Sequence, residues 1–221
     1  MKNLVRLLSL STCVLVLSAC NLIKPSTSSS TSTSASSSTT TDTSETTTTG
    51  EPPKNTCTLY LSGEALPFDN SGIHIDDESG AANKEMLITS LNGQVVAQFV
   101  TSLSASNCNI STDNSHVSQE TLHFTVGSSA SSGYAEFTFS KKIKKVIATC
   151  IAYYKETYSI DTDSTVVIDG ESHSIPNDPT ASKQEPHSFE KVYSTGSSKV
   201  KLSNMSGSQR FFLESIQLFY D

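Results

Sequence analysis

Tyr134-Ala135-Glu136-Phe137-Thr138-Phe139 is the stretch that decides the fold of this chain. Ala135, Phe137 and Phe139 fall on one face of an extended segment, and the residues between them, which include Glu136, fall on the other. This alternation is typical of an antiparallel strand with one face buried and one face in water. We therefore expect a sheet that packs its apolar face against a second layer.

Further strands are predicted on both sides of this stretch. Val146 to Tyr154 is apolar on both faces, which indicates a central strand. Asp169-Gly170 supplies the positive φ angles of a type I′ turn between two strands. The other candidate strands are Thr165 to Ile168, Ser172 to Ile175, Ser188 to Tyr193, Ser198 to Leu202 and Arg210 to Tyr220. Strands spaced by roughly ten residues without a long helix predict an all-β fold, an antiparallel β-sandwich.

The last strand should alternate along its whole length. Uninterrupted alternation from Arg210 to Tyr220 places Phe212, Glu214 and Ile216 on one face and Phe211 and Leu213 on the other.

Residues 55–118 are harder to interpret. Thr58 to Leu61 is a short strand candidate. Met86 to Leu91 and Gln94 to Val100 flank Asn92-Gly93, a strong hairpin signal. A helix over residues 82–91 competes with the hairpin, because its Lys, Glu and Met residues favour helix. Both alternatives stay open on the sequence.

The N-terminal residues have the order of an export signal. Lys2 and Arg6 precede the apolar run Leu7 to Leu17, and Leu17-Ser18-Ala19-Cys20 follows. The run is too short for a permanent membrane span, which needs about 20 residues. The segment resembles the lipobox of bacterial lipoproteins. The alternative is an ordinary secretory signal that is cut at another small residue.

The lipobox resemblance implies where the protein lies. It implies that residues 1–19 are removed as a lipoprotein signal peptide and that the thiol of Cys20 receives a diacylglyceryl group. Two or more acyl chains hold a protein stably on a bilayer. We therefore expect an extracytoplasmic protein that is lipid-anchored to the bacterial cell membrane, so its first partner is the membrane.

A low-complexity tether follows the lipidated cysteine. From Ser26 to Thr49 every residue is Ser or Thr except Ala35, Asp42 and Glu45. Such a segment has no apolar side chains to bury, so residues 20–54 are expected to be a disordered linker. The remaining residues, 55–221, are enough for one domain.

Residues 119–221 resemble a jelly-roll domain of secreted bacterial proteins, found in uncharacterised lipoproteins and beside extracellular endonuclease domains. The motifs that carry the resemblance are Leu122-x-Phe124-x-Val126-Gly127-Ser128-Ser129, Phe137-Thr138-Phe139, Ile143-x-x-Val146, the Asp169-Gly170 hairpin, Leu202-Ser203-Asn204 and Arg210-Phe211-Phe212-Leu213-x-Ser215-Ile216. These motifs are structural, and the resemblance implies no catalytic residues. His123 stands where that pattern has a basic residue.

Composition and motifs exclude several functions. The formal net charge of −7 disfavours nucleic acid as a partner, because phosphate contacts need a positive face. No G-x-S-x-G motif occurs, and no C-x-x-C or H-x-x-x-H spacing provides a zinc site. The five His residues lie in predicted turns and strand ends, where we expect them at the surface. The sequence therefore predicts no catalytic residues, no metal and no cofactor.

Candidate ligand-binding residues lie near the end of the central strand. Tyr153, Tyr154 and Tyr158 could form an aromatic platform for a sugar, since C–H faces of a pyranose stack on aromatic rings. The alternative is that they pack at the rim of the sheet. Arg210, the only Arg after the signal, either contacts a ligand or forms a structural ion pair.

Three cysteines remain after the signal and Cys20 are set aside. Cys150 shares a strand face with Val146 and Ala148, so it reads as a buried thiol. Cys57 and Cys108 either form a disulfide or stay free. A bridge between them would close about 50 residues and contribute roughly 4 kcal/mol on the chain-entropy model.

These observations support three functional hypotheses. The first is a tethered binding or adhesion module without enzymatic activity, for surface glycans or host proteins. The second is a structural or antigenic surface protein with no small ligand. The third is a tethered hydrolase.

Overall fold

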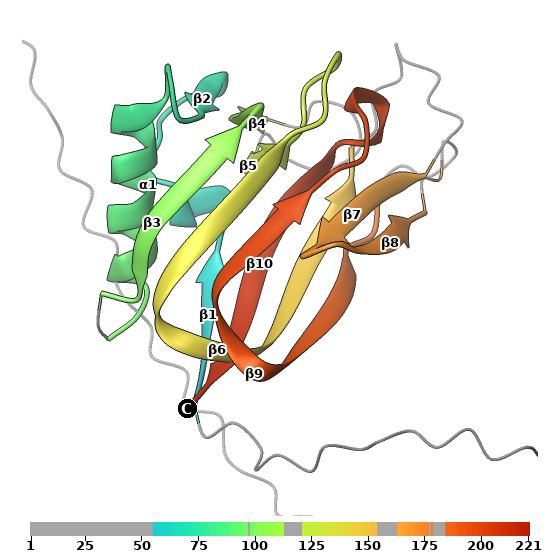
Figure 1. The fold of residues 1–221 in the computed structure, drawn as a ribbon. Helices are drawn as coiled ribbons and strands as arrows, with labels where there is room; N and C mark the ends of the chain where they lie inside the picture. The colour runs from blue at the N-terminus through green and yellow to red at the C-terminus, as the bar shows by residue number, and fades with distance from the viewer. Residues whose placement is uncertain (1–54, 97, 113–120, 154–162, 177, 179–183) are drawn as a thin grey trace, which may run out of the picture. The chain divides into compact units, whose positions relative to one another are not determined.

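A computed structural model describes residues 55–221 except 97, 113–120, 154–162, 177 and 179–183 (Figure 1). The signal, Cys20 and the linker lie outside the described residues. In chain order the elements are β1 Asn55–Tyr60, the 3-10 turn η1 Gly63–Ala65, β2 Ile73–Ile75, α1 Ala81–Gly93, β3 Val100–Ser106, β4 Cys108–Thr112, β5 Leu122–Val126, β6 Tyr134–Ala152, β7 Ser164–Ile168, β8 Glu171–Ile175, β9 His187–Ser203, the 3-10 turn η2 Gly207–Gln209 and β10 Phe211–Tyr220.

Two long bent strands, β6 and β9, connect the two layers of the fold. The first half of β6 pairs with β3 and with the second half of β9, which continues to β7 and β8. The second half of β6 pairs with β10 and with the first half of β9, and β10 pairs in turn with β1 and β5. All these pairings are antiparallel, and Figure 1 shows both long strands curving round at one end. The predicted all-β, jelly-roll-like sandwich is confirmed.

The alternating stretch at the start of β6 supplies one wall of the core. Ala135 and Phe137 are fully buried, and Phe139 is nearly so. The ring centroid of Phe137 lies 6.5 Å from that of Phe124, which comes from β5 in the opposite layer. Burial of these rings favours bringing the two layers together, since apolar burial contributes about 25 cal/mol per Å².

The sequence predicted two strands where the structure has one, in both β6 and β9. Residues 140–145, which separate the two predicted strands, lie within β6, and Ile143 among them is fully buried. Register shifts on either side of Ile143 let the strand bend without ending. Opposite this bend, Gly196 of β9 has a φ of 74°, which a residue with a side chain rarely adopts.

The hairpin alternative around Asn92-Gly93 is wrong, and the competing helix is α1. Leu87 and Leu91 bury one side of this helix against the sheet. The side chain of Asn92 ties the end of this helix to the start of β3: Oδ1 accepts the N–H groups of Phe99 and Val100, each at 2.8 Å. The chain therefore does reverse near Asn92, but from a helix into β3, because a side-chain bridge replaces the hairpin turn.

Two smaller predictions hold. The strand candidate Thr58 to Leu61 corresponds to β1, and Asp169-Gly170 joins β7 to β8 with φ angles of 45° and 86°. No helix among the described residues has the length and apolar content that crossing a membrane requires.

Candidate ligand-binding groove

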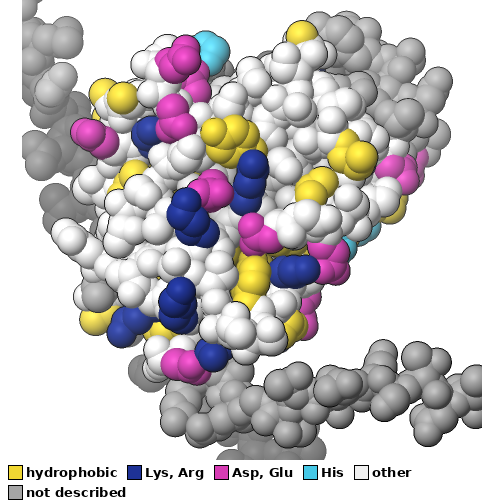
Figure 2. All heavy atoms as spheres, in the orientation of Figure 1, with side chains coloured by type: hydrophobic (Ala, Val, Ile, Leu, Met, Phe, Trp, Pro, Cys, Tyr) yellow, Lys and Arg dark blue, Asp and Glu magenta, His cyan; other side chains and the backbone are white. Residues whose placement is uncertain are grey.

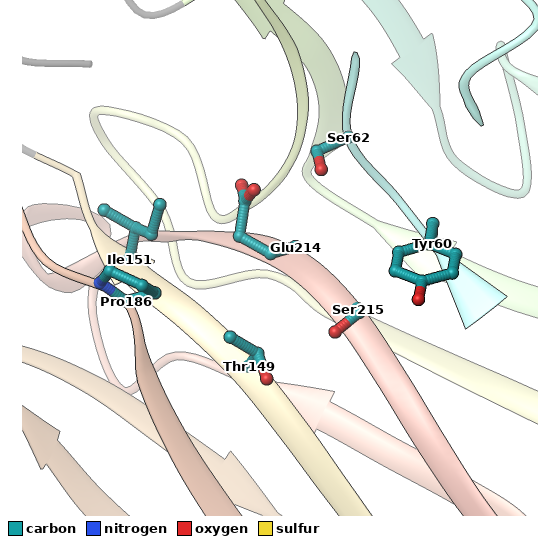
Figure 3. Close-up of a pocket in the computed structure, with 7 residues that line it drawn as sticks. All are labelled: Tyr60, Ser62, Thr149, Ile151, Pro186, Glu214 and Ser215. Carbon is teal, nitrogen blue, oxygen red and sulfur yellow. The ribbon is translucent and has the colours of Figure 1, made fainter. Parts of the chain in front are cut away.

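A groove with a volume of about 370 Å³ lies on the outer face of the layer that contains β10. Its lining comes from β1 and the residues after it, β6, β10 and the residue that precedes β9 (Figure 3): Tyr60, Ser62, Thr149, Ile151, Pro186, Glu214 and Ser215. Thr149 and Ile151 alternate along β6 with Ala148 and Cys150, which belong to the core. The groove side chains therefore point away from the core.

A β-bulge in β10 brings Glu214 to this face. The pairing with β6 shifts register between Leu213 and Ser215, so Glu214 is an extra residue in the strand. As a result Leu213 and Ile216 both face the core, and the predicted uninterrupted alternation is wrong. A bulge re-aims side chains in this way because two residues of one strand oppose one residue of its neighbour.

Glu214 is held by a histidine beneath it. Nδ1 of His123 on β5 lies 2.5 Å from Oε1 of Glu214. The side chain of His123 is only 2% exposed and that of Glu214 is 20% exposed. The imidazole packs on Phe212 with ring centroids 4.8 Å apart. His123 is therefore buried, and its expected surface position is wrong.

The remaining nitrogen of His123 and the remaining oxygen of Glu214 make no hydrogen bond within the described part of the chain. Nε2 of His123 is buried and has no hydrogen-bond partner there. Oε2 of Glu214 makes no hydrogen bond among the described residues either. Because Glu214 lines the groove, its carboxylate is the charged group of the pair that a ligand can reach.

Tyr60 stands at one end of the groove. Its side chain is 55% exposed, and it is the only Phe or Tyr of the described residues that lies well out in solvent. Its main chain is fixed from outside: its N–H donates to Oε1 of Gln94 at 2.7 Å, and Nε2 of Gln94 donates to its carbonyl at 3.1 Å. Gln94 directly follows α1, so the helix positions the strand that carries Tyr60.

The remaining lining is hydroxyl and apolar. Ser62, Thr149 and Ser215 offer hydroxyl groups, while Ile151 and Pro186 offer apolar surface. Figure 3 shows Glu214 between the apolar pair on one side and Ser62 and Tyr60 on the other. An exposed ring, three hydroxyls and one carboxylate can together stack on an apolar face and exchange hydrogen bonds with polar groups around it.

Tyr153 and Arg210, predicted as ligand-binding residues, lie together beside this groove rather than in its lining. The Cζ atom of Arg210 lies 3.6 Å from the ring centroid of Tyr153, and the ring is tilted against Phe212 with centroids 4.9 Å apart. The Tyr153 N–H also donates to the Arg210 carbonyl at 3.3 Å. Both side chains pack against each other, and their role in ligand binding stays a prediction. Tyr154 and Tyr158 lie outside the described residues.

Sequence reasoning missed Tyr60 and Glu214. A signal for Tyr60 was present, because the flanking Leu59 and Leu61 are core residues whose alternation points Tyr60 outward. No such signal existed for Glu214, since the bulge that places it cannot be read from the pattern of β10.

The disulfide that the sequence left open between Cys57 and Cys108 is not formed. Both are free thiols in the structure, as is Cys150. Cys57 pairs with Leu218 in one strand ladder, and the Sγ of Cys108 instead donates to the carbonyl of Tyr134 at 3.1 Å. Burial raises the pKa of Cys57 to about 11 and that of Cys108 to about 12, and it raises the pKa of Cys150 well above its usual value.

Charged side chains on the face shown in Figure 2 are interspersed by sign and gather into no basic patch. Within the Lys-rich stretch of β6, Lys144 lies 3.3 Å from Asp221 and Lys145 lies 3.1 Å from Glu190. Both of these lysines are therefore partnered by acidic groups.

Comparison with known proteins gives likenesses of fold only. No family model matches the chain, and no curated protein matches it. Among solved structures, a family 35 carbohydrate binding module from Clostridium thermocellum is similar with a TM-score of 0.36 and 8% identity, over 56% of this chain and 95% of that one.

Two further structures are similar at a comparable level. TmCBM61 in complex with β-1,4-galactotriose matches with a TM-score of 0.32 and 11% identity, over 56% of this chain and 91% of that one. The family GH115 4-O-methyl-α-glucuronidase BtGH115A, with specificity for decorated arabinogalactans, matches with a TM-score of 0.32 and 10% identity, over 65% of this chain and 24% of that one. Likenesses this distant carry no argument about what this chain binds.

Proposed function

We propose that this protein is a membrane-tethered module that binds carbohydrate through the groove between Tyr60 and Pro186. The observation that carries the proposal is the composition of the groove: one exposed aromatic ring, one carboxylate and three hydroxyls converge on a single hollow of the outer sheet face.

Sugars need this combination of groups. The C–H face of a pyranose ring stacks on an aromatic face, and Tyr60 is an aromatic residue that is 55% exposed. The hydroxyls around the pyranose both donate and accept hydrogen bonds. Ser62, Thr149 and Ser215 can do the same, while Glu214 only accepts.

The groove is prepared for a ligand before it binds. Gln94 fixes the backbone of Tyr60 and His123 fixes the carboxylate of Glu214. Such preorganisation lowers the conformational entropy that binding would otherwise cost. Side chains fixed in this way support the interpretation of the groove as a binding site and not as an incidental hollow of the surface.

The tether in this proposal rests on the N-terminal sequence. The lipobox-like Leu17-Ser18-Ala19-Cys20 and the Ser- and Thr-rich residues 26–49 support a lipid anchor on Cys20 and a flexible spacer. A binding module on such a spacer would hold glycans near the cell that carries it.

The geometry of the site supports binding without catalysis. A general base must come within hydrogen-bond reach of its substrate. Nε2 of His123, the nitrogen that would act in that way, is buried beneath the groove. The hydrolase alternative therefore has less support.

The test is a screen of glycan binding with matched variants. The full-length chain, purified in detergent, is applied to an array of bacterial, plant and animal glycans, and binders are measured by isothermal titration calorimetry. Tyr60→Ala should weaken binding by about tenfold or more, since aromatic contacts of this kind are worth about 0.5–1.5 kcal/mol beyond the area that they bury.

Met86→Ala is the control. Met86 is an exposed apolar side chain on α1, 46% exposed and outside the groove, so its loss should leave affinity unchanged. Absence of binding to every glycan on the array, or equal losses in the two variants, would contradict the proposal.

A further inference from the structure

Among the described residues, Glu214 is the only charged one that lines the groove, so its carboxylate sets the charge that a ligand meets there. A carboxylate accepts hydrogen bonds and donates none when it is ionised. It therefore binds ligand hydroxyls well and is repelled by a second carboxylate or by a sulfate.

On the basis of the proposed function, we infer that the His123–Glu214 pair makes this groove selective for uncharged, hydroxyl-rich sugars over acidic ones. The selectivity lies in Oε2 of Glu214, which has no hydrogen-bond partner among the described residues and belongs to a side chain that faces the groove. A pair of neighbouring sugar hydroxyls can donate to a carboxylate in this position.

His123 is a positioning residue in this account. Its Nδ1 lies 2.5 Å from Oε1 of Glu214 and its ring packs against Phe212, so the imidazole restricts how the carboxylate can turn. The bulge at Glu214 contributes too, because it is the point in β10 where the carboxylate meets Nδ1 of His123 on β5.

The surroundings reinforce the preference. No basic side chain of the described residues lines the groove. Within this described lining, an acidic sugar would place its charge near Glu214 without a counter-charge. Such an unpaired charge at a partly buried site discriminates strongly between two ligands of similar shape.

The experiment compares oligosaccharides that differ only at C6, where one carries a hydroxymethyl group and the other a carboxylate: glucose with glucuronate, galactose with galacturonate, and mannose with mannuronate series. Affinities are measured by isothermal titration calorimetry on the full-length chain in detergent. Whichever sugar series binds, we expect its neutral oligosaccharide to have an affinity about tenfold or more above that of the acidic counterpart.

Two sets of variants locate the selectivity. Glu214→Gln should weaken binding of the neutral sugar and reduce the preference for the neutral over the acidic sugar, because the substitution removes the charge of the side chain and keeps its shape. His123→Leu should lower the affinity for the neutral sugar in the same way. His123→Asn should restore most of it, since an Asn side-chain amide can donate from the place of Nδ1.

The outcomes separate this inference from the proposed function. Acidic sugars that bind as tightly as neutral ones, in a manner that Tyr60→Ala abolishes, would overturn the selectivity and leave a carbohydrate-binding groove. Equal losses in His123→Leu and His123→Asn would overturn the positioning role. No binding of any sugar would overturn both this inference and the proposed function.

Discussion

Asn204 shows how a single residue can hold separate parts of this fold together. Its buried Oδ1 accepts the N–H of Gly133 at 2.6 Å, and its Nδ2 donates to the carbonyl of Ser206. Gly127 packs directly on this side chain: a Cβ there would lie 2.5 Å from Nδ2. The motifs around Gly127 and Asn204, about 75 residues apart in sequence, are thus one structural unit.

Substitution at either residue should destabilise the domain. Asn204→Ala leaves the Gly133 N–H buried and unsatisfied and should cost about 1–3 kcal/mol of unfolding free energy. Gly127→Ala should cost a similar amount, because φ is +94° and its Cβ would collide with Asn204. Urea unfolding followed by circular dichroism measures both.

Gly93→Ala serves as the control for these substitutions. A Cβ there meets no atom within 4 Å, and its φ lies outside the positive range. Alanine should therefore be neutral or slightly stabilising at the end of α1. A Gly127→Ala protein as stable as Gly93→Ala would show that the contact with Asn204 is unimportant.

The cysteines make a second prediction at the scale of residues. Alkylation needs the thiolate, so raised pKa values slow it. At pH 8 in the native protein, labelling with iodoacetamide should be slow at half-buried Cys57 and slower at buried Cys108 and Cys150. Its rate at Cys57 should rise by about tenfold per pH unit and reach half its maximum near pH 11, because half of that thiol is deprotonated at its pKa.

Peptide mass spectrometry reads out which cysteines are labelled. In denaturant without reductant, Cys57, Cys108 and Cys150 should all carry the label. Protection of Cys57 and Cys108 together would reveal a disulfide that the structure does not contain. Rapid native labelling of Cys150 would mean that its face of β6 is not in the core.

At the scale of elements, the contact between the end of α1 and β1 positions the part of the groove that Tyr60 forms. Gln94 binds both main-chain groups of Tyr60 on the edge of β1 that faces away from β10. Gln94→Ala should therefore expose the Tyr60 amide to solvent and speed its hydrogen exchange. Exchange of the amides inside β10 should not change.

Gln98→Ala is a suitable comparison for this prediction. Gln98 has an exposed side chain and lies four residues after Gln94 in the chain, and Ser140 Oγ donates to its backbone carbonyl at 3.2 Å. Its replacement should leave the Tyr60 amide as protected as in the wild type. Unchanged exchange in Gln94→Ala would show that β1 holds Tyr60 without help from the helix.

At the scale of the whole molecule, the lipobox makes the anchoring prediction. Cys20→Ala removes the thiol that the lipobox resemblance marks for acylation. The variant should leave the membrane fraction or keep its signal, because a single short apolar run holds a protein only weakly. Fractionation, followed by mass spectrometry of the N-terminus, checks this.

Ser18→Thr is a milder control for the same experiment, since it keeps Cys20 and the apolar run. It should remain in the membrane fraction after a salt wash. A Cys20→Ala protein that stays there after the same wash would mean that something other than acylation holds the protein.

The sequence by itself determined the class of the fold and the positions of most strands after residue 121. Alternation in β6 and the Asp169-Gly170 turn are local signals, and the physics that they report acts between neighbouring residues. Only the tertiary structure decided that β6 and β9 pass through both layers. In sequence the polar residues at their bends resemble turns, and the burial of Ile143 in the core becomes apparent only in the fold. It also decided the groove. Tyr60, Glu214 and His123 come from three strands that are far apart in the sequence, and the bulge at Glu214 depends on how β10 pairs with β6. Pairing of this kind is set by contacts across the whole domain, which no short stretch of sequence encodes.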